Sequence, residues 1–272
     1  MNTPSATLRI LFLTATPVDL PRLAVDEEYR EVDRHIQGSR CRDRCELRYA
    51  SAVRGGELAQ ALQRHEPHVV HFSGHGSREG ELLLPDATGR SKPASPARVA
   101  ELFGILNARD LSIRCVVLNA CYSEPLALAL TEHVDCVIGT AAALKDKVAI
   151  TFAGAFYEAL GFGRDVEAAY LLARNRVALE VPAGVEPPRL HCRAGVDAAT
   201  VRLLPVARER TTEPDERAAL TPSLAVSSPP EESAHELRLT TVALLRDVSD
   251  AVFVEAVARE LKGRVVRLAG GS

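Results

Sequence analysis

At 272 residues, of which 46% are hydrophobic, the chain is long enough to bury one complete α/β core with residues to spare. Its formal net charge of −3, its 4% aromatic content and its lack of tryptophan give no basic or base-stacking surface, which argues against nucleic-acid binding. No apolar stretch approaches bilayer length, and the first residues show no secretory signal. We therefore expect a soluble, cytoplasmic protein without nucleic-acid or membrane partners.

Short apolar runs and amphipathic stretches alternate along the chain up to residue 180. Apolar runs bounded by turn residues predict buried strands, and apolar residues at helical spacing predict helices. In chain order the predicted elements are a strand at 8–13, a helix at 26–36, a strand at 46–50, a helix at 58–65, a strand from Val69, a strand at 81–84, a helix at 96–106, a strand at 113–118, a helix at 125–132, a strand at 135–138 and helices at 148–161 and 165–180. This alternation is typical of an α/β protein with a mainly parallel sheet.

The predicted helix at 26–36 carries many charges and one apolar stripe. We expect the stripe to face the core and the charged residues to face solvent. The stripe consists of Val25, Tyr29, Val32 and Ile36. A second stripe, in the helix at 148–161, consists of Phe152, Phe156 and Leu160.

The chain changes character after Val181, where prolines interrupt the helical periodicity, and residues 201–206 predict an edge strand. Residues 207–235 are charged and rich in Pro, Ser, Glu and Thr, as a disordered linker is. Residues 237–261 are helical again but too few to bury a core alone. The predicted organisation is a domain over residues 1–206, a flexible linker over 207–235 and a short helical tail over 236–272.

Cys121 stands at the carboxyl end of an apolar predicted strand. Apart from Arg114, residues 113–118 are apolar without alternation, as in a buried parallel strand, and a helix begins near Pro125. Ligands bind at the carboxyl ends of the strands in open α/β sheets. The positive end of a helix also favours the thiolate, which is the reactive form of cysteine. Cys121 is therefore a candidate nucleophile.

His75 occupies the same position on another predicted strand, the one that begins at Val69. Gly74 and Gly76 flank it and leave the backbone open to a substrate. If the two strands are neighbours, His75 can accept the proton of Cys121, and the amides of Gly76 and Cys121 can bind a developing oxyanion. The pair predicts a Cys–His dyad for acyl transfer. No third residue that would orient the histidine is evident from the sequence.

Residues 71–76 (HFSGHG) and 118–123 (LNACYS) resemble the paired histidine and cysteine motifs of the CHAT branch of the caspase-like cysteine peptidases. The resemblance covers roughly residues 8–180. It implies a caspase-like three-layer α/β/α sandwich with a mainly parallel central sheet, with His75 as base and Cys121 as nucleophile. It also implies a protein or peptide substrate and a role in a bacterial defence or signalling system, as in many such relatives. We expect neither a cofactor nor a metal.

Three residues near the dyad are candidate substrate contacts. Asp146 is the only acidic residue of the loop at 139–147, which leaves the strand beside the nucleophile. It either binds a basic substrate side chain or, as we favour, is the N-cap of the next helix. Asn119 stands where some caspase-like relatives with basic specificity carry an acid, so the preference for the residue before the scissile bond (P1) stays open. Ser73, two residues before His75, is the third candidate.

Two other groups of residues allow two interpretations each. His71 is either a packed strand histidine, which we favour, or a residue that helps to orient the site. Cys41 and Cys45 are close enough in sequence for a metal site, but the only further ligands in view, His191 and Cys192, are far along the chain. We expect reduced surface thiols at Cys41 and Cys45.

Two rival functions use the same fold. One is a catalytically silent α/β adaptor that binds partners through its C-terminal tail, and the other is a small-molecule hydrolase or transferase with the same dyad. A peptidase in the cytoplasm requires control, so we expect either an activating or adaptor protein that binds the tail or a misaligned resting site. Selective labelling of Cys121 by a thiol probe separates the peptidase from the silent adaptor.

Overall fold

The computed structural model of the chain describes residues 7–182, 184 and 186–204. All of them belong to the first of the two units into which the chain divides, Met1–Glu209. The predicted linker at 207–235 and the predicted tail at 236–272 lie outside the described residues, so the division into three parts stays a prediction. No helix in the described part of the chain is long and apolar enough to cross a membrane.

A mainly parallel sheet lies between two layers of helices. Its strand order is β2-β1-β3-β6-β7-β8, and all neighbours are parallel except β8, which is antiparallel to β7. The strands are β1 Leu8–Ala15, β2 Cys45–Ala50, β3 Val69–Gly76, β6 Cys115–Asn119, β7 Cys136–Gly139 and β8 Arg189–Cys192. Ser73 of β3 pairs with Asn119 of β6. The predicted adjacency of the histidine strand and the cysteine strand is therefore confirmed.

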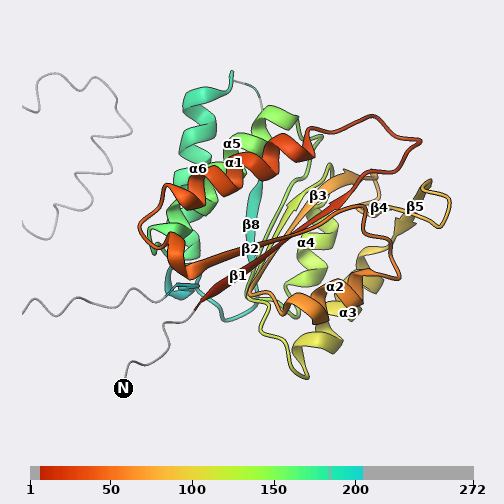
Figure 1. Cartoon of the computed structure of the whole chain (residues 1–272), viewed down its shortest axis with the longest axis horizontal. Coiled ribbons are helices and arrows are strands. Elements are labelled where there is room, and N and C mark those ends of the chain that lie inside the picture. The colour runs from red at the N-terminus through yellow and green to blue at the C-terminus, as the bar shows by residue number, and fades with distance from the viewer. Residues whose placement is uncertain (1–6, 183, 185, 205–272) are drawn as a thin grey trace, which may run out of the picture. The chain divides into compact units, whose positions relative to one another are not determined.

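Helices cover both faces of this sheet (Figure 1). One face carries α1 Val25–Gln37, α5 Asp146–Gly161 and α6 Val166–Glu180, and the other carries α2 Leu58–His65, α3 Pro96–Asn107 and α4 Glu124–Leu130. Alternate strand residues enter two separate cores. Val69 and Val117 join the core under α5, whereas Val70 and Val116 join the core under α3. The three-layer α/β/α sandwich expected from the sequence is confirmed.

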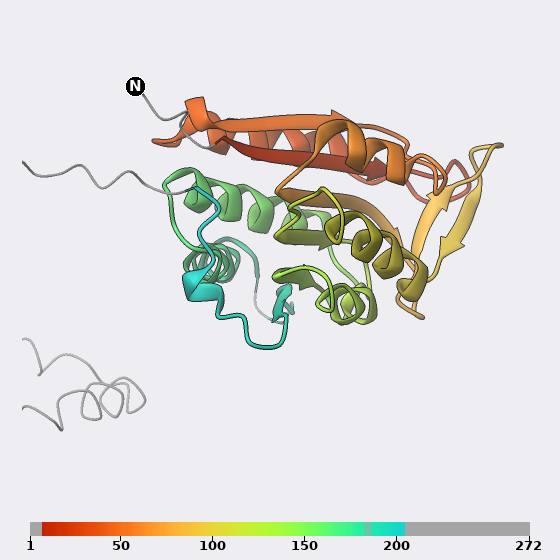
Figure 2. The same ribbon diagram turned by 90° about the horizontal axis from the view of Figure 1, so that it is seen from below.

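A β-hairpin extends the end of β3 that carries the histidine motif. Its strands are β4 Leu82–Pro85 and β5 Ser91–Ala94, and β4 pairs with His75 and Gly76. Figures 1 and 2 both show the hairpin projecting from the end of the sheet. It lies beside the histidine, as the sequence predicts, although the polar sequence of β5, with Pro93 in it, gives no strand signal of its own.

The edge strand beside β7 is β8 and not residues 201–206, so that prediction is wrong. Residues 201–204 form no strand, and residues 205–206 lie outside the described part of the chain. The apolar residues at 201–204 pack into the core under α5 instead. β8 is short and at least partly exposed along its whole length, so its sequence carries only a weak strand signal.

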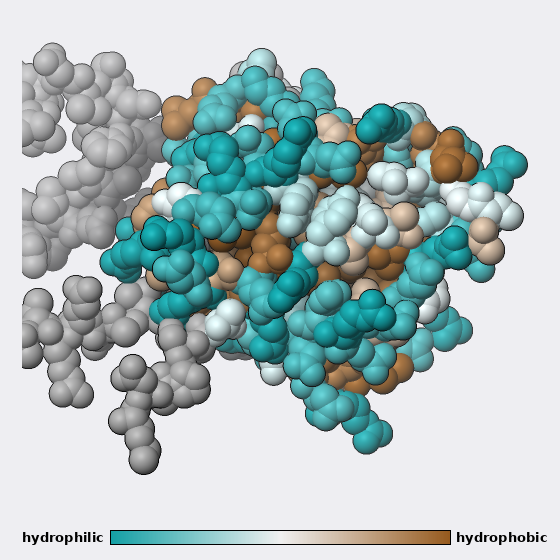
Figure 3. All heavy atoms as spheres, in the orientation of Figure 1, coloured by the Kyte–Doolittle hydropathy of each residue, from teal (hydrophilic) through white to brown (hydrophobic). Residues whose placement is uncertain are grey.

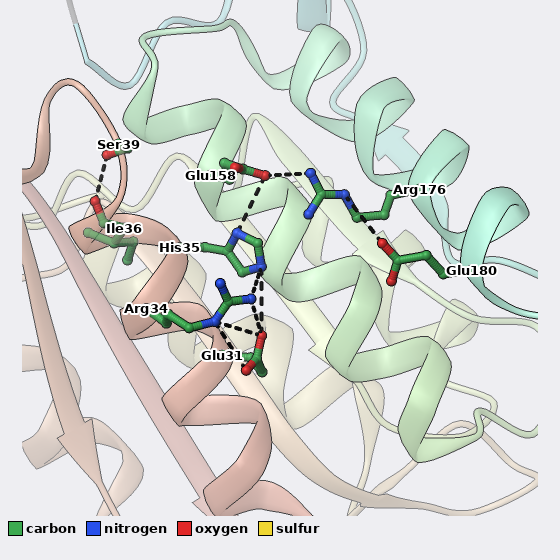
Figure 4. A network of polar contacts seen from close by, with 8 residues as sticks. All are labelled: Glu31, Arg34, His35, Ile36, Ser39, Glu158, Arg176 and Glu180. Carbon is green, nitrogen blue, oxygen red and sulfur yellow. Dashed lines mark hydrogen bonds and ion pairs between the residues drawn. The ribbon is translucent and has the colours of Figure 1, made fainter.

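α1 packs closely against α5, and a polar network lies along the contact (Figure 4). A Cβ at Gly154 of α5 would lie 2.8 Å from the ring of His35, so the absence of a side chain lets α1 approach the α5 backbone. The Nδ1 of His35 lies 3.4 Å from the carboxylate of Glu158 on α5. Arg176 of α6 donates to the same carboxylate at 2.8 Å. These contacts fix the position of α1 relative to α5 and α6.

The edge of the sheet opposite β8 is β2. Its residues Glu46 and Arg48 form an ion pair along this edge. Charged side chains on an edge strand disfavour pairing with a strand of another molecule. Figure 3 shows this side of the molecule as mostly hydrophilic, with smaller apolar areas between the charged side chains.

The prediction that Cys41 and Cys45 are surface thiols is wrong for Cys41 and holds only in part for Cys45; both are free thiols. Cys41 is only 8% exposed and belongs to the core under α5, and Cys45 is half-buried. Burial raises the pKa of Cys45 to about 11 and that of Cys115 to about 12. In the described part of the chain, no group of three or more His, Cys, Asp or Glu side chains is arranged to hold a metal ion.

Candidate active site

His75 is the penultimate residue of β3 and shares a strand face with Val69, toward α1. Its Nε2 lies 2.8 Å from the carbonyl oxygen of Pro21, in the loop between β1 and α1. A carbonyl oxygen only accepts hydrogen bonds, so Nε2 is the protonated nitrogen in this arrangement. The neutral ring then carries its free lone pair on Nδ1, which is the nitrogen available to act as a base.

The Pro21 carbonyl is a third, orienting group that the sequence does not reveal. It fixes the tautomer and the plane of the imidazole, as a carboxylate does in a Ser-His-Asp triad. Figure 1 shows the loop at 16–24 at the end of the sheet where the β4–β5 hairpin begins. Because the acceptor is a backbone atom, no residue type marks it, and only the path of this loop brings it to His75.

Cys121 follows β6 by two residues and is partly exposed. The amide of Leu144 lies 3.3 Å from its sulfur, and the carbonyl oxygen of Leu144 lies 3.9 Å from that sulfur. Tyr122 has a φ of 54°, in the left-handed region, and donates its amide to the carbonyl of Ala142 at 3.0 Å. The loop at 139–147 therefore borders Cys121, as the sequence predicts.

His75 and Cys121 line one pocket of about 30 Å³, enough for a water molecule. Gly76 brings the two strand ends together, because a Cβ at this position would overlap the carbonyl oxygen of Cys121. Among the described residues, no hydrogen bond joins His75 to Cys121, and none engages the backbone amide of Cys121. A larger pocket of about 700 Å³ beside α5 and α6 includes neither residue of the pair.

The candidate substrate residues Ser73, Asn119 and Asp146 all line the small pocket. Asp146 is not the N-cap of α5, contrary to the interpretation that we favour from the sequence; Lys145 holds that position. The Asp146 carboxylate instead accepts a hydrogen bond from the amide of Ala24 at 3.3 Å. Ala24 is the N-cap residue of α1, and the first amides of a helix lack partners within the helix. The carboxylate thus binds an amide at the start of α1 rather than one at the start of α5.

A buried carboxylate that the sequence analysis does not identify lines the same pocket. Glu28 of α1 is only 4% exposed. Its Oε1 accepts hydrogen bonds from His71 Nε2 at 2.7 Å and from Asn119 Nδ2. Its Oε2 accepts one from the Ser73 hydroxyl at 2.6 Å. The Oδ1 of Asn119 is buried without a partner among the described residues.

The signal that could have identified Glu28 is its place on α1. The sequence predicts that the charges of this helix face solvent, but Glu28 lies on the buried side. Val25, Val32 and Ile36 are buried there as expected, whereas Tyr29 is only partly buried. A carboxylate on the buried face of a helix is costly unless donors compensate it, so its position calls for buried partners.

His71 is a packed strand histidine, as we favour from the sequence. It is fully buried, and its ring stacks on Phe12 with 4.3 Å between the ring centroids. Its Nδ1 lies 3.2 Å from the hydroxyl of Tyr157. Its hydrogen bond to Glu28 also connects it to the residues that line the pocket.

Comparison with known proteins places these features in a family. The chain is 27% identical over 177 residues to a protein of Gillisia limnaea named "Probable protease", covering 64% of this chain and 31% of that protein. It is 25% identical over 182 residues to a "Roc-COR-CHAT protease" from an unknown prokaryotic organism, covering 65% of this chain and 17% of that protein. The chain thus spans less than a third of the length of these two relatives.

Among solved structures, caspase-1 from Spodoptera frugiperda matches with a TM-score of 0.47 and 12% identity, covering 71% of this chain and 88% of that one. The model of the CHAT domain family matches residues 4–180, which include both strand ends of the small pocket. This chain is a member of the CHAT domain family.

Proposed function

We propose that the chain is a caspase-like cysteine endopeptidase in which Cys121 is the nucleophile and His75 the base. The observation that carries this proposal is that His75 and Cys121 end neighbouring parallel strands and line one pocket. A thiol and an imidazole in such a position are the minimal equipment for acyl transfer. The names of the relatives, both of which are called proteases, agree with this chemistry.

The first step of the proposed reaction is proton transfer. The Cys121 thiol gives its proton to Nδ1 of His75, while Nε2 keeps its proton in the hydrogen bond to Pro21. The S–H bond turns from the Leu144 carbonyl toward the imidazole by rotation about the Cβ–Sγ bond. The thiolate then attacks the scissile carbonyl carbon, and the amide π-electrons move onto the carbonyl oxygen.

The backbone amides of Gly76 and Cys121 are the proposed oxyanion hole. The Cys121 amide has no partner among the described residues, so it is free to donate to a substrate oxygen. Each such donor contributes on the order of 3–4 kcal/mol to transition-state stabilisation. When the intermediate collapses, the C–N bond breaks and the leaving amine takes the proton from His75. Water, deprotonated by His75, then cleaves the thioester and restores the thiol.

The pocket beside the dyad is the proposed site for the P1 side chain. Asp146, Ser73 and Asn119 line it, and the buried Oδ1 of Asn119 is an acceptor without a partner among the described residues. Such a lining suits a P1 side chain that donates hydrogen bonds. At about 30 Å³ the pocket is narrow, so we expect the residues that border it to move apart when a long side chain enters.

The proposed substrate is a partner protein in a bacterial defence or signalling system, and an activating or adaptor protein is proposed to act through residues 236–272. The motif resemblance supports both proposals. Hydrogen–deuterium exchange on the full chain tests the second one. Exchange in the tail that stays unchanged with every candidate partner would contradict control through the tail.

Proteome-wide mapping of new N-termini tests the peptidase proposal. Cells that express the wild type should yield cleavage products that are absent with Cys121→Ala and with His75→Ala. Cys192→Ser is the matched control, because Cys192 is also partly exposed but does not line the pocket. New N-termini that persist in Cys121→Ala would contradict the proposal. Their absence from the wild type, with an activating partner present, would favour the silent adaptor.

A further inference from the structure

We infer that Glu28 is a positioning residue that sets the separation between His75 and Cys121 by linking the two strands that carry them. This inference rests on the proposed function, because it assigns Glu28 a role in the same dyad. No contact joins Glu28 directly to either member of the pair among the described residues. Its effect is expected to pass through Ser73 and Asn119.

The register of β3 and β6 gives Glu28 this role. Ser73 and Asn119 pair across the two strands, and both donate to the Glu28 carboxylate. His75 and Cys121 each follow these donors by two residues. Residues two apart on a strand share a face, so His75 lies next to Ser73 on the side where Glu28 stands. One carboxylate therefore bridges the two strands two residues before the proposed catalytic pair.

The chemistry of the network favours a carboxylate over any other side chain at position 28. Three donors, from His71, Ser73 and Asn119, converge on its two oxygens. A glutamine would keep the shape but would turn an NH2 group toward some of these donors. Burying a charge is costly, and a buried ion pair is weak evidence for a gain in stability. An apolar side chain at position 28 would leave these three buried donors without an acceptor, so the carboxylate both satisfies them and links the two strands.

The helix that carries Glu28 is itself held firmly. His35 lies two turns further along α1 and contacts Glu158 of α5, which also binds Arg176 of α6 (Figure 4). The Asp146 carboxylate accepts a hydrogen bond from the amide of Ala24 at the start of α1. Both ends of α1 are therefore tied to other elements, so the carboxylate is presented to β3 and β6 in a fixed position.

A role in substrate specificity is the alternative for a carboxylate that lines this pocket. Three protein donors already occupy Glu28, and it is only 4% exposed, so little of its capacity remains for a substrate cation. The two roles differ in their kinetic signature. A positioning residue affects kcat for every substrate, whereas a specificity residue affects KM for substrates with a basic P1 residue.

The alkylation rate of Cys121 tests the inference without any knowledge of the substrate. The full chain is treated with iodoacetamide at pH 7.5, and modification of Cys121 is followed by peptide mass spectrometry. The variants are Glu28→Gln, the reference His75→Ala and the matched control Tyr157→Phe. Tyr157 is fully buried and contacts the far nitrogen of His71, so its substitution perturbs the same network without touching the strand bridge.

We expect Glu28→Gln to slow alkylation at least tenfold, toward the rate of His75→Ala, while Tyr157→Phe stays within about twofold of the wild type. Equal rates for Glu28→Gln and the wild type would overturn the inference. If His75→Ala also leaves the rate unchanged, the dyad itself is absent and the proposed function fails. Should Glu28→Gln not fold, Ser73→Ala, which removes one link of the bridge, is expected to slow alkylation by a smaller factor.

A kinetic readout separates positioning from a purely structural effect. On a peptide that contains a mapped cleavage site, Glu28→Gln should lower kcat at least tenfold with KM within about threefold of the wild type. The same loss is expected with basic and with neutral P1 residues. A lower melting temperature with unchanged kcat would make Glu28 merely structural, and a rise in KM restricted to basic P1 residues would make it a specificity residue.

Discussion

At the scale of single residues, a backbone carbonyl orients the imidazole of His75. Because the acceptor is the carbonyl of Pro21, its position depends on the conformation of the loop at 16–24 and not on a side chain. The fixed φ of proline limits the directions in which the preceding backbone can run. We therefore expect the residue type at position 21 to affect the proposed reaction through the freedom of the backbone.

Substitution of Pro21 tests this dependence. Pro21→Gly keeps the carbonyl but frees the backbone, so we expect kcat to fall several-fold, together with a loss of about 1 kcal/mol in the free energy of unfolding that any proline-to-glycine change in a loop shares. Pro21→Ala should have a smaller effect. Steady-state cleavage of a peptide with a mapped site measures kcat for both variants. Pro187→Gly, in a segment that does not contact His75, is the control, and an equal kcat for Pro21→Gly and this control would contradict the role of the carbonyl.

The reactivity of Cys45 is a second residue-scale prediction. Burial is the main reason why the pKa of this thiol is raised to about 11, so nearly all of the thiol is protonated at neutral pH. Only the thiolate reacts with iodoacetamide, so the labelling rate should rise roughly tenfold per pH unit between pH 7 and 9. Peptide mass spectrometry on the folded chain measures this slope. A rate that begins to level off by pH 9 would show that the thiol titrates near its ordinary pKa and is not held in a buried environment.

At the scale of elements, the close contact between α1 and α5 depends on two glycines of α5. A Cβ at Gly161 would overlap the hydroxyl of Ser39, which donates to the carbonyl of Ile36 at 2.7 Å just beyond the end of α1 (Figure 4). Gly154 allows the corresponding approach of His35 further back along α5. The two glycines therefore set the distance between the helices.

Gly161→Ala tests this close packing. Alanine is favoured over glycine in helices by roughly 0.5–1 kcal/mol, but forcing a methyl group into a packed contact typically costs about 1–3 kcal/mol. We therefore expect a net loss of roughly 1 kcal/mol in the free energy of unfolding, measured by urea denaturation. Gly56→Ala is the control, because a Cβ there meets nothing within 4 Å. A more stable Gly161→Ala variant would show that the contact relaxes easily.

Elements with strong local patterns are predictable from the sequence, and short or polar ones are not. The helix at 58–65 has the predicted bounds, and Phe152, Phe156 and Leu160 are buried as their spacing indicates. β5 and β8 are missed because each is short and polar, and pairing with a neighbour rather than its own sequence makes it a strand. The same limit applies to the start of α5. There the Asp146 carboxylate accepts a hydrogen bond from the amide of Ala24 beside α1 instead of capping its own helix.

The candidate site shows a similar limit. His75 and Cys121 are predictable because each follows an apolar run, and parallel strands bring their carboxyl ends to one edge. The Pro21 carbonyl leaves no mark in the sequence. Glu28 looks like one more charge on an amphipathic helix until the structure places it against Ser73 and Asn119. The residues that do the proposed chemistry are thus visible in the sequence, and the groups that orient them are not.

At the scale of the whole molecule, partly buried histidines couple stability to pH. His68 accepts a hydrogen bond from the amide of Arg9 on its Nδ1 at 3.1 Å, so the folded state requires this nitrogen to be unprotonated. Burial, followed by the charges of Arg9 and Arg114, lowers the pKa of His68. Burial is also the first cause that lowers the pKa of His35 and His191.

Stability should therefore fall as the medium becomes acidic. An unfolded histidine takes up a proton below about pH 6.5, whereas these folded histidines resist it, so the unfolded state binds more protons as the pH drops. We expect the free energy of unfolding in urea to be highest above pH 7 and to decrease toward pH 5. His68→Asn, whose Oδ1 can accept from the Arg9 amide but does not titrate, should reduce this slope. An identical slope in the variant would contradict the assignment to His68.

The loop between β1 and α1 has a consequence for how this chain can vary in length. Surface loops usually tolerate insertions and deletions, but here one stretch of chain delivers both the Pro21 carbonyl and, a few residues on, the Glu28 carboxylate. Removing a single residue would either withdraw the carbonyl or advance the helix by one position, which turns it by about 100°. Glu28 would then point away from its donors. Homologous sequences that keep the dyad should thus preserve the spacing between these two positions even where the residues between them differ freely.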